Sequence, residues 1–145
     1  MSEARQEYLR TIIQRSRRSL KLAHRCLEMD DFQSASINAY SAAFHGMKAL
    51  LELENVAASK HGRVIGEINR LFVKTGRFEK ETSRIIDRLF RHRQIGSYDY
   101  EREISAEEAK LDVEDADCLL REFENLLRQQ TQDGFFRASN AESDR

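Results

Sequence analysis

One almost uncharged stretch constrains the fold of this chain more than any other feature. From Phe32 to Leu51 the only formally charged residue is Lys48, and apolar or small side chains recur around the whole circumference of a helix drawn through it. A helix that is apolar on nearly every side must be buried on several sides. We therefore expect this helix at the centre of a bundle, where its small residues allow neighbouring helices or a second subunit to approach closely.

Further segments show apolar residues at helical spacing, and local signals mark several of their ends. Asp31 is suited to cap the central helix, Ser105 and Glu108 fit a capping box, and Gly76 is suited to follow a helix end. The predicted helices run from about Ala4 to Met29, Phe32 to Glu54, His61 to Thr75, Phe78 to His92 and Ala106 to Arg128. Together they predict an all-α, up-and-down bundle of four to five helices.

The length of 145 residues fits one domain that can bury a core without disulfides. We predict a single bundle over residues 1–128 and a disordered tail over residues 129–145, where Phe135 and Phe136 are the apolar exceptions. Cys26 and Cys118 each fall in an apolar helical register without a CxxC or Cys/His cluster. We therefore expect buried, reduced thiols, no metal site, no cofactor and a cytoplasmic protein. No run approaches the ~20 apolar residues of a membrane span, so no membrane association is expected.

Charge is distributed unevenly along the chain although the net charge is only −1. Residues 60–93 carry ten basic and four acidic side chains, whereas residues 99–128 carry four basic and eleven acidic ones. This asymmetry favours a cationic face that binds phosphates or an acidic partner. The alternative is that the basic and acidic helices of one bundle neutralise each other.

The stretch from Arg88 to Tyr100 concentrates the chemistry of the chain. A basic stripe on the fourth predicted helix leads to Arg93, which a continued helix would aim toward the apolar arc of that helix and not simply into water. Gly96 and the polar residues around it predict a loop, which carries Tyr98, Asp99 and Tyr100. The stripe consists of Arg77, Lys80, Arg84, Arg88 and Arg91.

From Leu20 to Leu127 these features resemble the HEPN superfamily of small helical bundles. The segment D-D-F-Q-S-A-S-I-N-A-Y-S-A-A-F-H-G-M-K-A-L-L resembles the central helix of that family, and the turn S-K-H-G-R-V-I resembles the Lys-His-Gly turn of one of its bacterial and archaeal branches. The stretch from Lys74 through Arg93 to Tyr100 matches the same branch. The residues at the family positions of the central helix are Asn38, Tyr40, Phe44 and His45.

The resemblance implies a function as well as a fold. Ribonucleases of this family form homodimers and cut RNA without metal, using an arginine and a histidine four to six residues later. In the toxin branch this reads Arg-x4-His-x-Tyr, and a partner nucleotidyltransferase silences the toxin by attaching AMP to the tyrosine. Arg93, Tyr98 and Tyr100 match those positions, which makes them the catalytic candidates, but Tyr98 stands where the histidine should be. Tyrosine, with a reference pKa near 10, is a poor base at neutral pH.

Three functions remain open from the sequence. The first is a homodimeric HEPN module of a toxin–antitoxin or defence-type system, which binds RNA or a nucleotide and pairs with a nucleotidyltransferase. The second is a metal-independent endoribonuclease that uses Arg93 with Tyr98 or His92, although His92 lies too close to Arg88 and too far from Arg84 to restore the motif. The third is a purely structural interaction protein. The binding candidates are Arg84, Arg88, Arg91, His92, Asp99, His45 and His61.

Each candidate also has a structural interpretation. Arg93 is suited to bind phosphate or to pair with Asp99 at a helix end, and Asp99 is suited to cap a turn. The two tyrosines can pack and fix the loop. A histidine on the central helix, His45, is most often a hydrogen-bonded core residue, and His61 can hold an anion at a helix start or serve as a turn residue.

Overall fold

The computed structural model describes residues 1–131, and over this range it contains helices and no strands. The predicted all-α class is therefore confirmed. The tail residues 132–145, including Phe135 and Phe136, lie outside the described residues. The elements are α1 (Glu3–Glu28), α2 (Phe32–Leu53), α3 (His61–Ile68), the short π-helical segment η1 (Asn69–Val73), α4 (Lys80–Tyr98) and α5 (Ala106–Gln130).

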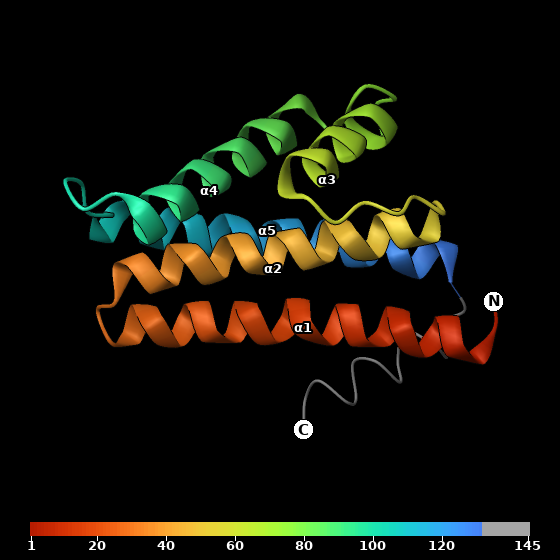
Figure 1. The fold of residues 1–145 in the computed structure, drawn as a ribbon, viewed down its shortest axis with the longest axis horizontal. Coiled ribbons are helices and arrows are strands. Elements are labelled where there is room, and N and C mark those ends of the chain that lie inside the picture. The colour runs from red at the N-terminus through yellow and green to blue at the C-terminus, as the bar shows by residue number, and fades with distance from the viewer. Residues whose placement is uncertain (132–145) are drawn as a thin grey trace.

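Helix α2 occupies the centre of the bundle, as its composition predicts. It packs against α1, α3, α4 and α5, and Figure 1 shows α1 running antiparallel along one side of it while α4 slants across the other. Half of its residues are buried, from Ala35 near its start to Leu51 near its end. The small residues of α2 serve close packing, since a Cβ at Gly46 would lie 2.6 Å from Cδ2 of the buried Phe123 on α5.

The two helix starts that were predicted from side-chain caps, at Asp31 and Ser105, are confirmed. The side chain of Asp31 accepts a hydrogen bond from the backbone N–H of Ser34. Ser105 and Glu108 form both hydrogen bonds of a capping box at the start of α5. Gly76 adopts a left-handed backbone with φ of +80°. The helix predicted to reach Thr75 instead passes from α3 into η1, and α5 continues to Gln130, two residues past the predicted end.

The prediction of a loop at Gly96 is wrong, because α4 continues to Tyr98. The glycine is needed for helix contact: a Cβ at Gly96 would lie 3.3 Å from the backbone oxygen of Gln33 and 3.3 Å from Cγ1 of Ile37, both in the first turns of α2. Glycine therefore lets the end of α4 approach α2 closely, and Arg93 and Tyr98 share one helix.

The expectation of two buried thiols is wrong for Cys118, which is exposed, whereas Cys26 is half-buried. Cys118 precedes the inward-facing Leu119 and Leu120, and α5 turns its side chain to the surface. Burial and the charge of Asp31 raise the pKa of the Cys26 thiol. Among the helices within residues 1–131, none combines the length and apolarity that crossing a bilayer requires.

Candidate functional site

Arg93 projects from the last turns of α4 with most of its hydrogen-bonding capacity unused. Its guanidinium carbon lies 5.6 Å from the centre of the Tyr98 ring, and Nη1 donates to the side-chain oxygen of Gln94 at 3.1 Å. The side chain is half-buried, and within residues 1–131 no carboxylate forms an ion pair with it. A guanidinium has five N–H donors in a planar fork that matches phosphate oxygens. Arg93 is therefore a cation held in place by an aromatic ring, with donors left for an anion.

An aromatic cluster lies one helical turn away from Arg93. The rings of Tyr40 and Phe44 on α2, His61 at the start of α3 and Phe90 on α4 pack with centroids 4.4–6.1 Å apart. The hydroxyl oxygen of Tyr40 lies 2.8 Å from Nδ1 of His61. Tyr40 is almost fully buried, whereas His61 is half-buried and reaches the surface. Three segments far apart in the sequence thus meet at one histidine.

The electrostatics of this cluster favour a neutral histidine. Burial first, and then the positive charge of Arg93, lower the pKa of His61 below its ordinary value. Burial raises the pKa of the Tyr40 hydroxyl far above its ordinary value, although the charge of Arg93 acts in the opposite direction. Tyr40 therefore keeps its proton at neutral pH, and the lowered pKa of His61 favours its neutral form.

His45 lies next to this cluster, on α2. Its ring packs edge-on against Phe44 with centroids 5.8 Å apart. Burial, followed by the charges of Arg15, Lys48 and His61, lowers the pKa of His45. His45 is half-buried, so the structure gives it both an aromatic neighbour and a cationic surrounding.

The end of α4 and the segment that follows it present both candidate tyrosines to solvent. Tyr98 is 66 % exposed and Tyr100 is 98 % exposed. Asp99 does not pair with Arg93 but accepts hydrogen bonds from the backbone N–H groups of Glu101 and Arg102, at 2.9 and 3.2 Å. This is the turn-capping role expected for Asp99. An open cavity runs along the segment and is lined by Gln94, Ile95, Tyr98, Asp99, Tyr100 and Glu101.

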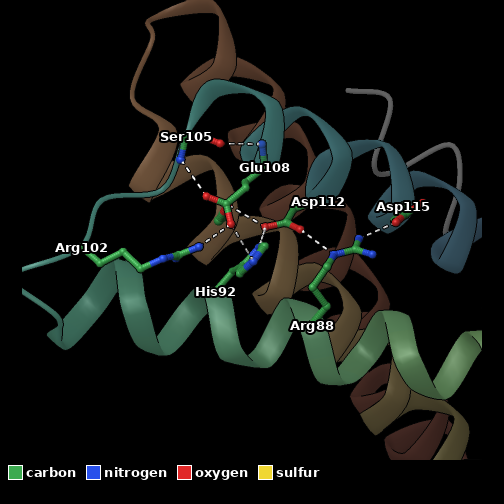
Figure 2. Close-up of polar contacts among 8 residues, drawn as sticks. Arg88, His92, Arg102, Ser105, Glu108, Asp112 and Asp115 are labelled. Carbon is green, nitrogen blue, oxygen red and sulfur yellow. Dashed lines mark hydrogen bonds and ion pairs between the residues drawn. The ribbon is translucent and has the colours of Figure 1, made fainter.

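His92 and Arg88 face the inside of the bundle, where they join α4 to α5 (Figure 2). Nδ1 of His92 lies 2.6 Å from Asp112, and Nε2 lies 3.2 Å from Glu108. Arg88 binds the same Asp112 at 3.2 Å and also pairs with Asp115. Both ring nitrogens of His92 thus contact carboxylates. The side chain of Arg88, which helical periodicity predicted to face solvent, points into the bundle instead. These contacts give both residues a structural role.

The remaining candidates of the stripe are on the surface. Arg84 pairs with Glu81 at 3.4 Å and is largely exposed, and Arg91 is exposed. Neither of them reaches the aromatic cluster through a contact among the described residues. Of the sequence candidates, the structure places Tyr98 against Arg93 and brings the charge of Arg93 near His61, and it leaves Arg84 and Arg91 as flanking cations.

Asp112 is a residue that sequence reasoning did not single out. It is completely buried and accepts hydrogen bonds from Ser36 at 2.8 Å and from Arg88, in addition to its contact with His92. Asp112 falls on the apolar face of α5, next to Ala109 and Val113. A carboxylate at such a position is buried and needs polar partners, and this was the signal that the sequence offered. Within residues 1–131, no three His, Cys, Asp or Glu side chains gather as a metal site would require.

The structure is an all-α bundle around a buried central helix, with an arginine near the end of α4 followed by a Tyr-Asp-Tyr segment. Residues 9–130 match the HEPN domain family, and the chain belongs to that family. The predicted resemblance is therefore confirmed.

Three relatives extend the comparison. A protein of Thermotoga maritima named "UPF0332 protein" is 35% identical over 113 residues, which cover 78% of this chain and 86% of the relative. Two proteins of Methanocaldococcus jannaschii are each 28% identical. One, "Putative toxin MJ0142", aligns over 70% of this chain and 69% of its own length. The other, "Putative toxin MJ0605", aligns over 85% of this chain and 91% of its own length.

Proposed function

We propose that this chain is the HEPN module of a toxin–antitoxin or defence-type system, which binds RNA or a nucleotide through Arg93. The observation that supports this most directly is the state of the Arg93 side chain. It is half-buried, rests on the Tyr98 ring and has no carboxylate partner within residues 1–131. Two other arginines of α4 differ, since Arg88 is paired inside the bundle and Arg84 is paired on the surface, and Arg91 is exposed where Arg93 is half-buried. The two M. jannaschii relatives are both named "Putative toxin".

Phosphate is the ligand chemistry that fits this arginine. A planar guanidinium can donate two parallel hydrogen bonds to phosphate oxygens, and a partly desolvated site strengthens them. Tyr98, exposed beside it, offers a ring on which an unpaired base can stack. Arg91 and Arg84 lie on the same helix and can add attraction that depends on salt. Together these groups favour a single-stranded RNA or a nucleotide.

The binding experiment compares single variants at one salt concentration. Fluorescence anisotropy with a labelled single-stranded RNA is expected to show that Arg93→Ala weakens binding by about tenfold to a hundredfold, the usual loss for hydrogen bonds to a charged group. Arg70→Ala is the matched control, because Arg70 is exposed and paired with Glu67 on a different segment. Equal affinities of the wild type and Arg93→Ala would contradict the proposal, and an absence of RNA and nucleotide binding would favour a purely structural protein.

The proposal includes a homodimer, in which two copies of Arg93 lie in one cleft. The open cavity next to Arg93 and the exposed Tyr98 and Tyr100 are suited to a partner surface. Light scattering at micromolar concentration is expected to give the mass of two chains. A monomer under those conditions would contradict the shared cleft while leaving binding by a single Arg93 intact.

A nucleotidyltransferase partner is the second element of the proposed system. Tyr100 is 98 % exposed, so its hydroxyl is accessible to a modifying enzyme. The test is co-expression with a small nucleotidyltransferase from the same genome, if one is encoded next to this chain, followed by mass spectrometry. We expect AMP on Tyr100 and none on a Tyr100→Phe variant. An unmodified Tyr100 beside an active transferase would contradict this pairing.

A further inference from the structure

The histidine missing from the Arg-x4-Tyr motif has a spatial replacement. His61 comes 32 residues before Arg93 in the sequence, and the fold places its ring parallel to Phe90, with centroids 5.9 Å apart. Phe90 and Arg93 are three residues apart on α4, so they lie on the same face of that helix. His61 therefore packs on the face of α4 that carries Arg93, and it lies near enough for the charge of Arg93 to lower its pKa, although no sequence spacing links the two residues.

The Tyr40 contact determines which nitrogen of His61 is available. Tyr40 occupies Nδ1 at 2.8 Å, so the nitrogen left for a ligand is Nε2. Within the described residues, Nε2 forms neither a hydrogen bond nor an ion pair. A hydroxyl can either donate to Nδ1 or accept from an Nδ1–H. Tyr40 can therefore support both tautomers, and Nε2 can act as a base or as a donor.

The geometry points to His61 as the proton-transfer residue of an RNA-cleaving site, with Arg93 of the same chain as the phosphate-binding residue. This inference rests on the proposed function, since it needs RNA bound at Arg93. It adds a catalytic residue from α3 that the Arg93–Tyr98 spacing does not contain. The substrate class is single-stranded RNA, because the step uses a 2′-hydroxyl and a flexible backbone that can align it with the phosphorus.

The step balances without a metal or an added reactant. Nε2 of His61 accepts the proton of the 2′-hydroxyl, and the 2′-oxygen forms a bond to the adjacent phosphorus. The bond from phosphorus to the 5′-oxygen breaks, and that oxygen takes a proton from water. The products are a 2′,3′-cyclic phosphate and a 5′-hydroxyl end, and the histidinium returns its proton to the hydroxide that was left. Arg93 stabilises the negative charge that develops on the phosphate oxygens.

The charged and titratable groups around His61 suit this role. Tyr40 and His45 face it from α2, and Arg93 faces it from α4. The lowered pKa of His61 keeps the ring neutral at physiological pH, so that Nε2 is ready to accept a proton. Tyr98 then serves to hold Arg93 and to stack with a base, and needs no proton transfer of its own.

The experiment follows cleavage and binding separately. A 5′-labelled single-stranded RNA is incubated with the protein in the presence of a chelator, and the products are resolved together with a matched oligonucleotide that carries 2′-deoxyribose. We expect the RNA alone to be cut, with cyclic phosphate ends. His61→Asn is expected to lower the rate at least a hundredfold, the usual contribution of general acid–base catalysis, while RNA affinity changes less than twofold.

The control is His24→Asn, which removes an exposed histidine paired with Asp117 on another face and should leave the rate unchanged. Full activity of His61→Asn would overturn the inference. A wild-type protein that binds RNA through Arg93 but does not cut it would also overturn the inference. That result would not contradict the proposed function. If His61→Asn does not fold, the pH–rate profile of the wild type decides. A cleavage rate that depends on one basic group with a pKa below 6.5 would support His61 as the base. A profile without such a group would overturn the inference.

Discussion

The hydroxyl oxygen of Tyr40 lies 2.8 Å from Nδ1 of His61, which joins the centre of α2 to the first residue of α3. Tyr40→Phe keeps the ring in the aromatic cluster and removes only this hydrogen bond. We expect the free energy of unfolding to fall by about 1 kcal/mol, the typical net value of such a bond. Urea titration measures it, with Tyr8→Phe as the control at a half-exposed ring. A Tyr40→Phe protein as stable as the wild type would contradict the contact.

The buried carboxylate of Asp112 is expected to be the most sensitive polar position of the bundle. Asp112→Ala removes a partner from Arg88, His92 and Ser36 at once. Removing one partner from a buried charge network lowers the free energy of unfolding by about 3–5 kcal/mol. We expect a decrease near the lower figure, because Asp115 still pairs with Arg88 and Glu108 still pairs with His92. Denaturant unfolding is the measurement.

Asp117→Ala is the matched control for this prediction. Asp117 lies on the same helix as Asp112 but pairs at the surface with His24 of α1, and surface pairs contribute about 0–1 kcal/mol. If the two variants lost the same stability, the polar network between α4 and α5 would not be holding those helices together.

Gly46 is expected to tolerate no side chain. A methyl group there would lie 2.6 Å from Cδ2 of Phe123, a ring with no exposed surface. Overpacking of this kind costs about 1–3 kcal/mol, which exceeds the roughly 1 kcal/mol that alanine gains over glycine in a helix. Gly46→Ala should therefore lower the melting temperature. Gly66→Ala on α3, where nothing lies within 4 Å of the new methyl group, should leave it unchanged or raise it.

The stability of the bundle is expected to fall on acidification below neutral pH. The pKa values of His45 and His61 are lowered in the folded chain, in both cases by burial first. In the unfolded chain both titrate near 6.5, so the unfolded state binds protons first as the pH falls. Their contribution is therefore complete above about pH 6.5 and is lost as the pH drops toward the folded pKa values.

Melting temperatures between pH 7.5 and pH 5 measure this dependence. A double variant, His45→Gln with His61→Gln, should show a shallower decrease over this range than the wild type does. An equal decrease in both proteins would show that other groups control the acid sensitivity.

Local patterns in the sequence were sufficient to predict the helices, but not the pairs that link them. The uncharged run of α2 and the caps at Asp31 and Ser105 can be recognised from residues that are close together in the sequence. The structure confirms all three. Gly96 was misread because glycine is typical of both a turn and a close helix contact, and only the position of α2 distinguishes them.

The candidate site shows the same limit. Periodicity places Arg88 on a polar face, but its inward turn depends on where Asp112 of α5 lies. The contact of His61 with Tyr40 spans 21 residues and depends on how α3 folds back onto α2. Arg93 and Tyr98 could be selected from the sequence because their spacing resembles the family motif, whereas the approach of His61 to Arg93 required the tertiary structure.

The most direct test of the account is to observe where RNA touches the protein. Side-chain NMR resonances of Arg93 (Nε–Hε) and His61 (the ring) can be followed during titration with a short single-stranded RNA, with Arg70 as the internal reference. We expect the Arg93 and His61 signals to shift together and to saturate at the same RNA concentration, while the Arg70 signal is unaffected. Saturating RNA that shifts other arginines and leaves Arg93 and His61 unchanged would contradict it.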